Sequence, residues 1–237
     1  MTETYQFQLP LVQGAQAQKH VTINEALARL DAAAQLRLVS VVETLPPTNL
    51  ADGMAFGVPT GAVNAWDGHS GKVAIYANSG WVFLPPSVGW SAWVEDAADF
   101  AIFDGVNWRL GARAVSVQRA TTGLAIFEFE HSIVSGTSNA TSVEIEDGLL
   151  VFGVTGRVTQ SITGSGLTAF DLGVGNNATS FGSGIGLSAG SNFRCMLGKP
   201  QAFWGSEPLI LTAVSGSFSA GSVRFAIHGL RLEPPQN

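Results

Sequence analysis

The chain has 237 residues, 46% of them hydrophobic and 28 of them glycine, which is enough for hydrophobic cores and favours short strands over a helical bundle. The net charge of −6 is spread along the chain without a Lys/Arg cluster, which excludes a nucleic-acid surface and a surface for anionic membranes. The single cysteine, Cys195, excludes an internal disulfide framework and a Cys/His zinc cluster, so we expect no metal and no cofactor.

Residues 1–45 are predicted to form an N-terminal arm followed by one helix. The first ten residues lack the basic and apolar stretches of a secretory signal, and no segment approaches the roughly 18 apolar residues of a membrane span. We therefore expect folding in the cytoplasm and no membrane insertion. A polar run, QGAQAQ at 13–18, precedes the helix and is interpreted as part of an assembly arm.

The helix itself has a start signal and an apolar stripe. Thr22 and Glu25 have the spacing of a capping box, which predicts a helix that begins near Ile23 and runs for about 16 residues toward Pro46. Apolar residues recur at steps of four and three and form the candidate oligomerisation stripe: Ile23, Leu27, Leu30, Ala34 and Leu38. The stripe fits a helix that lies on its own domain and equally a helix that packs against copies of itself.

Residues 46–112 are predicted to form a small Trp-rich module of β-hairpins. The segments AIYANSGW (74–81) and AIFDGVNW (101–108) match in register, with Ala-Ile-aromatic followed after four residues by Trp. Each copy is typical of a strand, a tight turn and a return strand that begins at the tryptophan. We expect Trp81 and Trp108 to occupy equivalent positions in the core.

Residues 113–237 are predicted to form an antiparallel β-sandwich of jelly-roll type. Strict alternation in IFEFEH (126–131) and VEIE (143–146) places apolar and acidic side chains on opposite faces of half-buried strands. Several such strands, separated by Gly/Ser turns, are the pattern of a sandwich. The fold class is therefore mainly β, with an arm, one helix, a hairpin module and a C-terminal sandwich.

The sequence offers no catalytic constellation. The acidic pairs Glu128/Glu130 and Glu144/Glu146 could act in glycoside cleavage, but the same spacing is produced by any solvated face of a sheet. The histidines lie in separate segments without metal-ligand spacing, and the glycine-rich stretch 173–191 matches no phosphate-binding loop. That stretch is either an adaptable binding loop at one end of the sandwich or a plain connection.

The candidate binding residues are polar side chains and a tryptophan in the sandwich. Indole rings stack on the apolar faces of sugars, yet small β domains also need tryptophan in their cores, so both roles stay open for the six in the chain. Glycan contacts are assigned to the following residues: Asn176, Asn177, Ser183, Asn192 and Trp204.

Five segments resemble an uncharacterised domain family of phage-derived proteins found in alphaproteobacterial prophages and gene transfer agents. The first half of the chain carries the resemblance most closely, and the sandwich segments carry it less distinctively. The segments are LPLVQGAQAQKHVTINEALARLD (9–31), AWDGHSGKVAIYANSGWVFLPPSVGWSAWVED (65–96), FDGVNW (103–108), FGSGIGLSAGS (181–191) and PLILTAVSGSFSAGSVRFAIHGLRL (208–232).

The resemblance implies a virion component, such as a head spike or tail fibre of a phage-like particle, with a role in attachment to the cell surface. It brings no catalytic residues. We therefore expect a homo-oligomeric particle protein, not an enzyme, that is assembled in the bacterial cytoplasm and whose partners are itself, other particle proteins and host surface polysaccharide. The alternatives are a particle-borne glycan depolymerase and an assembly protein without a ligand.

Overall fold

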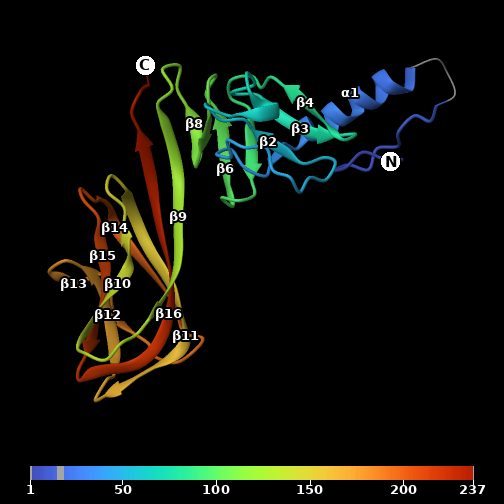
Figure 1. The fold of residues 1–237 in the computed structure, drawn as a ribbon. Helices are drawn as coiled ribbons and strands as arrows, with labels where there is room; N and C mark the ends of the chain where they lie inside the picture. The colour runs from blue at the N-terminus through green and yellow to red at the C-terminus, as the bar shows by residue number, and fades with distance from the viewer. Residues whose placement is uncertain (1, 15–18, 237) are drawn as a thin grey trace. The chain divides into compact units, whose positions relative to one another are not determined.

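The computed structural model describes residues 2–14 and 19–236, so residues 15–18 of the predicted polar arm lie outside the described part. The chain divides into two compact units. The first comprises the chain up to Thr121 and the segment from Pro234 onward, and the second is Thr122–Glu233 (Figure 1). The predicted mainly β class is confirmed, with one α-helix near the N-terminus of the described chain and several antiparallel sheets.

The first unit begins with the helix and a mixed sheet. Helix α1 (Lys19–Ala34) leads into the short strand β1 (Arg37–Leu38), which pairs in parallel with β5 (Ser91–Val94). β5 pairs antiparallel with β6 (Asp99–Phe103), and β6 with β7 (Trp108–Leu110). The helix is thus tied to the Trp-rich module by a strand that follows it directly.

Both ends of α1 differ from the prediction. The helix begins at Lys19, so Thr22 and Glu25 lie inside it and the predicted capping box is wrong; Glu25 instead pairs with Arg29 one turn later, at 2.7 Å. The helix ends at Ala34 rather than continuing toward Pro46, because the next residues enter the sheet. Leu38 is fully buried in β1 and does not belong to the helical stripe.

A second sheet completes the first unit. It orders as β2 (Ala55–Gly57), β3 (Val73–Ala77) and β4 (Gly80–Leu84), all antiparallel. The short 3₁₀ helix η1 (Asn64–Trp66) places the indole of Trp66 in full burial beside this sheet, and β8 (Ala112–Val115) lies near the end of the unit. Aromatic side chains therefore fill much of the core of the hairpin module.

The predicted repeat is confirmed as two hairpins of the same design. Tyr76 pairs directly with Trp81 across β3 and β4, and Phe103 pairs with Trp108 across β6 and β7. The ring centroids of the two pairs lie 5.2 and 5.4 Å apart, a favourable aromatic distance. The first turn, Asn78-Ser79, has positive φ angles of 51° and 62°, as a type I′ hairpin turn requires.

The second unit is a jelly roll. Numbered from 1 to 8 within the unit, its described strands pair in the order 1-8-3-6 in one sheet and 2-7-4-5 in the other, which confirms the predicted topology. The strands are β9 (Thr121–Ser132), β10 (Ser138–Ile145), β11 (Leu150–Ser165), β12 (Ala169–Val174), β13 (Asn177–Ile185), β14 (Asn192–Ala202), β15 (Glu207–Val214) and β16 (Ser217–Glu233).

The inner faces of both sheets form a common core, as the alternation predicts. In β9, Phe129 is half-buried against Phe225 and Glu130 is exposed. The alternation fails at Val143, which it places in the core but which is exposed, and the apolar Phe152 of β11 is exposed as well. Register shifts lie at both places, and an added residue in a strand turns the following side chain to the opposite face.

Candidate functional site

Two polar side chains of α1 hold the N-terminal arm against the helix. The Asn24 amide group accepts a hydrogen bond from the Val12 backbone N–H (2.9 Å) and donates one to the Val12 carbonyl (3.0 Å). Two turns later, the buried Asp31 carboxylate accepts three hydrogen bonds from the arm, from the Thr4 hydroxyl (2.6 Å) and the backbone N–H groups of Gln6 (2.7 Å) and Phe7 (2.8 Å). The arm therefore has two anchors about 10 Å apart on one helix face.

The charge state of Asp31 is set by these contacts. Burial by itself raises the pKa of the carboxyl group, but hydrogen bonds from the Thr4 hydroxyl and from the backbone of Gln6, Phe7 and Tyr5 outweigh it. The net result is a pKa below the ordinary value of Asp. The carboxylate is thus charged at neutral pH and serves as an acceptor for the arm.

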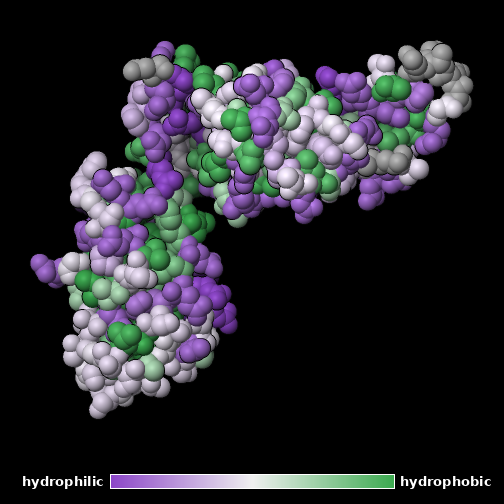
Figure 2. Space-filling view, viewed as in Figure 1, coloured by the Kyte–Doolittle hydropathy of each residue, from purple (hydrophilic) through white to green (hydrophobic). Residues whose placement is uncertain are grey.

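The apolar stripe of α1 is not the face that packs on its own unit. Asp31 and Ala32 are the buried residues of the helix, whereas Ile23 and Leu30 are 45% and 57% exposed. Leu27 is half-buried and Ala34 is exposed, and hydrophobic residues are visible at the surface over α1 (Figure 2). Four of the five residues predicted for oligomerisation therefore lie on the helix and form an apolar surface, which we call the α1 stripe (Ile23, Leu27, Leu30 and Ala34).

A cavity of about 480 Å³ lies between α1 and the β3–β4 hairpin. Its apolar lining comes from both elements: Val21, Ala28, Ala32, Ile75, Trp81 and Val82. Charged residues, among them Glu25 and Arg29, also line it. The cavity lies on a different side of the helix from the α1 stripe, and it leaves Trp81 only half-buried.

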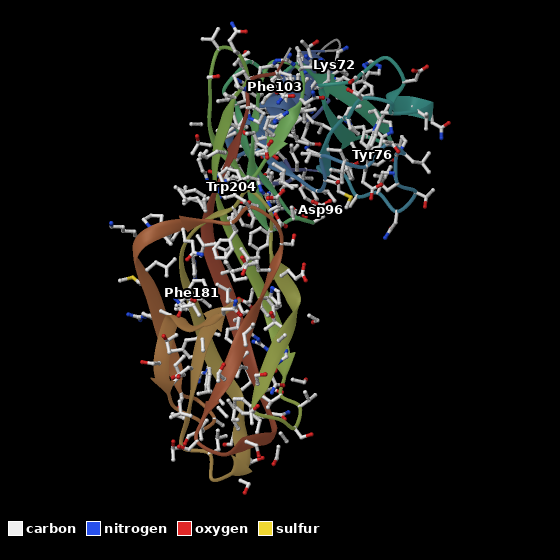
Figure 3. All side chains as sticks on the ribbon, turned by 90° about the vertical axis from the view of Figure 1, so that its left-hand side faces the viewer. Lys72, Tyr76, Asp96, Phe103, Phe181 and Trp204 are labelled. Carbon is white, nitrogen blue, oxygen red and sulfur yellow. The ribbon has the colours of Figure 1, made fainter. Side chains whose placement is uncertain are left out.

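The tryptophans divide into core and surface positions. Trp66 and Trp108 are buried, which confirms the core position predicted for Trp108. Trp81, for which an equivalent core position was predicted, packs against the core beside Trp66 and is half-buried. The reason is the adjacent cavity, which leaves one side of the indole uncovered. Trp93 is exposed, and Trp204 is 87% exposed on the turn after β14, where Figure 3 labels it.

The glycine-rich stretch is not a long loop, so the predicted adaptable binding loop is wrong. Nine of its 19 residues form strand β13, whose Phe181 points into the sandwich core (Figure 3). Close packing requires two of the glycines in the stretch, Gly173 and Gly182. A Cβ at Gly173 would lie 1.9 Å from the Asn177 carbonyl oxygen, and one at Gly182 would lie 2.7 Å from Cys195 Sγ.

The structure divides the predicted glycan residues into two groups. Asn176 and Trp204 lie on turns at the end of the jelly roll where β12, β14 and β16 finish, and Asn177 is the first residue of β13 at the same end. Ser183 and Asn192 instead line a hollow of about 440 Å³ between the edge strands β13 and β14, near the opposite end. The five residues therefore do not form one site.

A second hollow adjoins this one across β14. It has a volume of about 410 Å³ and is lined by polar side chains of β9, β11, β14 and β16: Glu128, Thr155, Arg157, Asn192, Arg194 and Arg224. Asn192 and Arg194 line both hollows. We call the second hollow the arginine groove. Asn192 is one of the predicted glycan residues, but the arginines were not predicted, because they are far apart in the chain and meet only through strand pairing.

Two of the four glutamates weighed as catalytic groups, Glu130 and Glu146, form ion pairs on the surface. Glu130 accepts hydrogen bonds from the Thr159 hydroxyl (2.7 Å) and the Arg224 guanidinium (3.0 Å), and these contacts lower its pKa. Glu146 pairs with Arg231. A general acid in glycoside cleavage needs a raised pKa, so the environment of Glu130 is opposite to that requirement.

No cluster of His, Cys, Asp or Glu side chains within residues 2–14 and 19–236 has the geometry to hold a metal ion. In the same ranges, no helix combines the length and apolar character needed to cross a membrane.

Comparisons with known proteins give a partial match. Residues 23–109, which lie in the first unit, match a family described as "Protein of unknown function (DUF2793)". No curated protein sequence matches the chain. One solved structure to which it is similar is the cyanophage Pam1 capsid asymmetric unit, at 16% identity and a TM-score of 0.33, covering 47% of this chain and 84% of that one.

Proposed function

We propose that the protein is a homo-oligomeric structural component of a phage or gene transfer agent particle, a spike or fibre whose jelly roll attaches to polysaccharide on the host cell. The observation that carries the assembly part is the α1 stripe. The helix packs on its own unit through Asp31 and Ala32 and leaves two large apolar side chains, Ile23 and Leu30, in solvent. Such a surface is typical of a protein–protein contact.

A second copy of the chain is the partner that we propose for this stripe. The helix is about 24 Å long and its apolar face about 10 Å wide, which is small beside the roughly 800 Å² that each partner buries in a stable interface. The arm supplies more apolar area, because Phe7 and Val12 are exposed and are bonded to the adjacent helix face. We therefore propose that arm and helix assemble together.

Polysaccharide attachment is proposed for the second unit. Double-sheet jelly rolls occur among viral capsid and lectin domains, which supports the proposal by analogy of fold. The two adjoining hollows beside β14 add a site-level argument, since they present hydroxyl, amide and guanidinium groups together on an exposed edge of the sandwich. Such shallow polar sites bind weakly one by one, and an oligomer raises the overall affinity by avidity.

The alternative activity is a glycan depolymerase. It is favoured by the acidic residues on the sandwich, and disfavoured by the lowered pKa of Glu130 and the ion pair of Glu146. We therefore propose binding without cleavage. Incubating the protein with host polysaccharide and measuring new reducing ends tests this, since steady release of reducing ends would establish the enzyme.

The assembly proposal is tested by light scattering coupled to gel filtration. We expect the wild-type chain to be an oligomer at micromolar concentration and the double variant Ile23→Glu/Leu30→Glu to be a monomer. The control is Val63→Glu, which adds one negative charge, half that of the double variant, at a similarly exposed site in the first unit. A monomeric wild-type protein, or an oligomer that survives the double substitution, would refute the role of the α1 stripe.

Attachment and particle membership need separate tests. Labelled protein should adsorb to capsulated host cells and much less to capsule-deficient cells; equal adsorption to both would contradict polysaccharide recognition. Immunogold labelling of particles released from the encoding bacterium should place the subunit on the particle, and its absence from purified particles would remove the structural role.

A further inference from the structure

We infer that the arginine groove recognises a carboxylate-bearing sugar, so that the polysaccharide bound by the jelly roll is an acidic one that contains uronic or similar acid residues. The inference rests on the proposed function and names the ligand class for it. It is carried by the side chains that the strand order brings together in the groove.

The guanidinium groups come from three adjacent strands. Arg157 on β11 and Arg224 on β16 are direct cross-strand partners, and Thr155, two residues before Arg157, is the partner of Arg194 on β14. Directly opposed residues have Cβ atoms about 5 Å apart, and diagonal neighbours lie about 7–8 Å apart, so the three long side chains share one surface. The arginines therefore form a cluster fixed by the sheet register.

The cluster is costly in the free protein. Like charges on directly opposed strand positions destabilise a sheet, and Arg157 faces Arg224 in this way. Glu130 relieves only Arg224, whose pKa is raised by its hydrogen bond to that carboxylate. Neither Arg157 nor Arg194 has an ion-pair partner within residues 2–14 and 19–236. A bound anion would remove this repulsion.

The net charge of the arginine groove is positive, whereas the net charge of the whole chain is negative. Glu128 is the carboxylate that lines it beside the three arginines, and the arginines still outnumber the acids when Glu130 is added. The chain as a whole carries a formal charge of −6. A positive hollow on an acidic protein steers anions to one place and disfavours their contact elsewhere.

The chemistry of the lining favours a sugar acid over a simple anion. Guanidinium groups bind carboxylates through paired, planar hydrogen bonds. Thr155 and Asn192 add neutral donors and acceptors for hydroxyl groups, and the volume of about 410 Å³ falls within the range of small-molecule sites. The adjoining hollow with Ser183 continues past Asn192 and Arg194, which gives a polymer chain a path across β14.

The test uses oligosaccharides from polygalacturonate, polyglucuronate and polymannuronate, each with its methyl ester as an uncharged match, in calorimetric or surface-binding titrations with the full chain. We expect at least one acid form to bind, its methyl ester to bind about tenfold or more weakly, and binding to weaken as NaCl is raised. Dextran sulfate serves as a polyanion without carboxylates and is expected to bind more weakly than the best uronate.

The variants separate recognition from general charge. Arg157→Gln and Arg194→Gln should each lower the affinity about tenfold or more, and Arg194→Lys should recover only part of it, because an ammonium group lacks the planar pair of donors. The control Lys199→Gln removes the same charge from an exposed site on the same strand, outside the groove, and should bind as wild type. Unchanged thermal melts would show that the variants are folded.

The outcomes distinguish this inference from the proposed function. Equal binding of acid and ester forms, unchanged affinity in both Arg→Gln variants, or equal or tighter binding of dextran sulfate would overturn the acidic-sugar site, while capsule-dependent adsorption would leave polysaccharide attachment intact. Absence of binding to every uronate also overturns it. If the protein bound no uronate and also adsorbed equally to capsulated and capsule-deficient cells, both the acidic-sugar site and polysaccharide attachment would be refuted.

Discussion

Replacing Asp31 with Asn should release the N-terminal arm from α1 while the rest of the first unit stays folded. The carboxylate accepts from Thr4 and Phe7 through one oxygen and from Gln6 through the other. In the variant, the amide oxygen can keep the first two bonds, but the new NH₂ group faces the Gln6 N–H, so two donors oppose each other. The substitution thus removes one bond and the charge, and changes the volume little.

The size of the effect follows from these three contacts. A hydrogen bond to a charged group contributes about 1.5–3 kcal/mol, and a neutral acceptor gives roughly half of that. One lost bond and two weakened ones sum to about 3–6 kcal/mol for closure of the arm. Since 1.4 kcal/mol is a tenfold change, the arm should open at least roughly a hundredfold more often.

Amide hydrogen exchange measured by NMR reads this opening directly. In Asp31→Asn, the Gln6 and Phe7 amides should lose their protection, while amides of β5 and β6 keep theirs. Glu25→Gln is the control, because it removes a negative charge from an exposed position of the same helix. Unchanged exchange of Gln6 and Phe7 in the Asn variant would refute the view that Asp31 holds the arm.

The same contact predicts a pH dependence. Because the pKa of Asp31 is lowered in the folded chain, its contribution to arm closure is complete above the unfolded value of about 3.9 and is lost as the pH falls through the folded value. In the wild-type chain, loss of the arm contact should therefore begin below about pH 4 and be complete below the folded pKa of Asp31. In Asp31→Asn, the arm should be open both at neutral pH and below about pH 4.

Two further predictions concern packing. Trp108→Ala should lower the free energy of unfolding by about 3–5 kcal/mol, and Trp81→Ala by less, because a cavity already lies beside Trp81. Urea denaturation of the two variants measures these losses, and equal losses would contradict the difference in burial between the two tryptophans. Gly173→Ala should destabilise the jelly roll by about 1–3 kcal/mol, because its Cβ would collide with the Asn177 carbonyl, whereas Gly198→Ala, with open space around its Cβ, should change stability by less than about 1 kcal/mol. Equal thermal melts of the two glycine variants would show that the close approach at Gly173 is absent.

Periodicity predicted the features that depend on local pattern. The repeat at 74–81 and 101–108 became two hairpins with the same aromatic pair, and the alternation in β9 placed Phe129 and Glu130 on the correct faces. These predictions succeed because side-chain direction in a regular strand follows from residue spacing alone. The jelly-roll topology is confirmed for a similar reason, since few arrangements bury that many half-apolar strands.

The misses arise where long-range contacts outweigh local signals. The capping box predicted at Thr22 does not form, because the helix begins one turn earlier, at Lys19. The C-terminal end of the helix is set by the pairing of β1 with β5, a strand more than 50 residues away in sequence. The glycines in 173–191 predicted a loop, whereas two of them, Gly173 and Gly182, lie in strands where neighbouring atoms leave no room for a Cβ. Such a contact cannot be predicted from the local sequence. The arginine groove was invisible for the same reason, since only the sheet register brings Arg157 and Arg224 face to face.

The position of the jelly roll in the chain has an evolutionary consequence. The chain enters it on β9 and leaves it on β16, which are neighbours in one sheet, so its two ends lie close together. The flanking segments are themselves joined in the first unit, where the Gln236 N–H donates to the Gln118 carbonyl at 2.9 Å. Domains with adjacent termini are readily inserted into, and removed from, a host fold. Recombination at these two points can thus exchange the whole sandwich for another as a cassette, leaving the helix, the arm and the hairpin module unaltered.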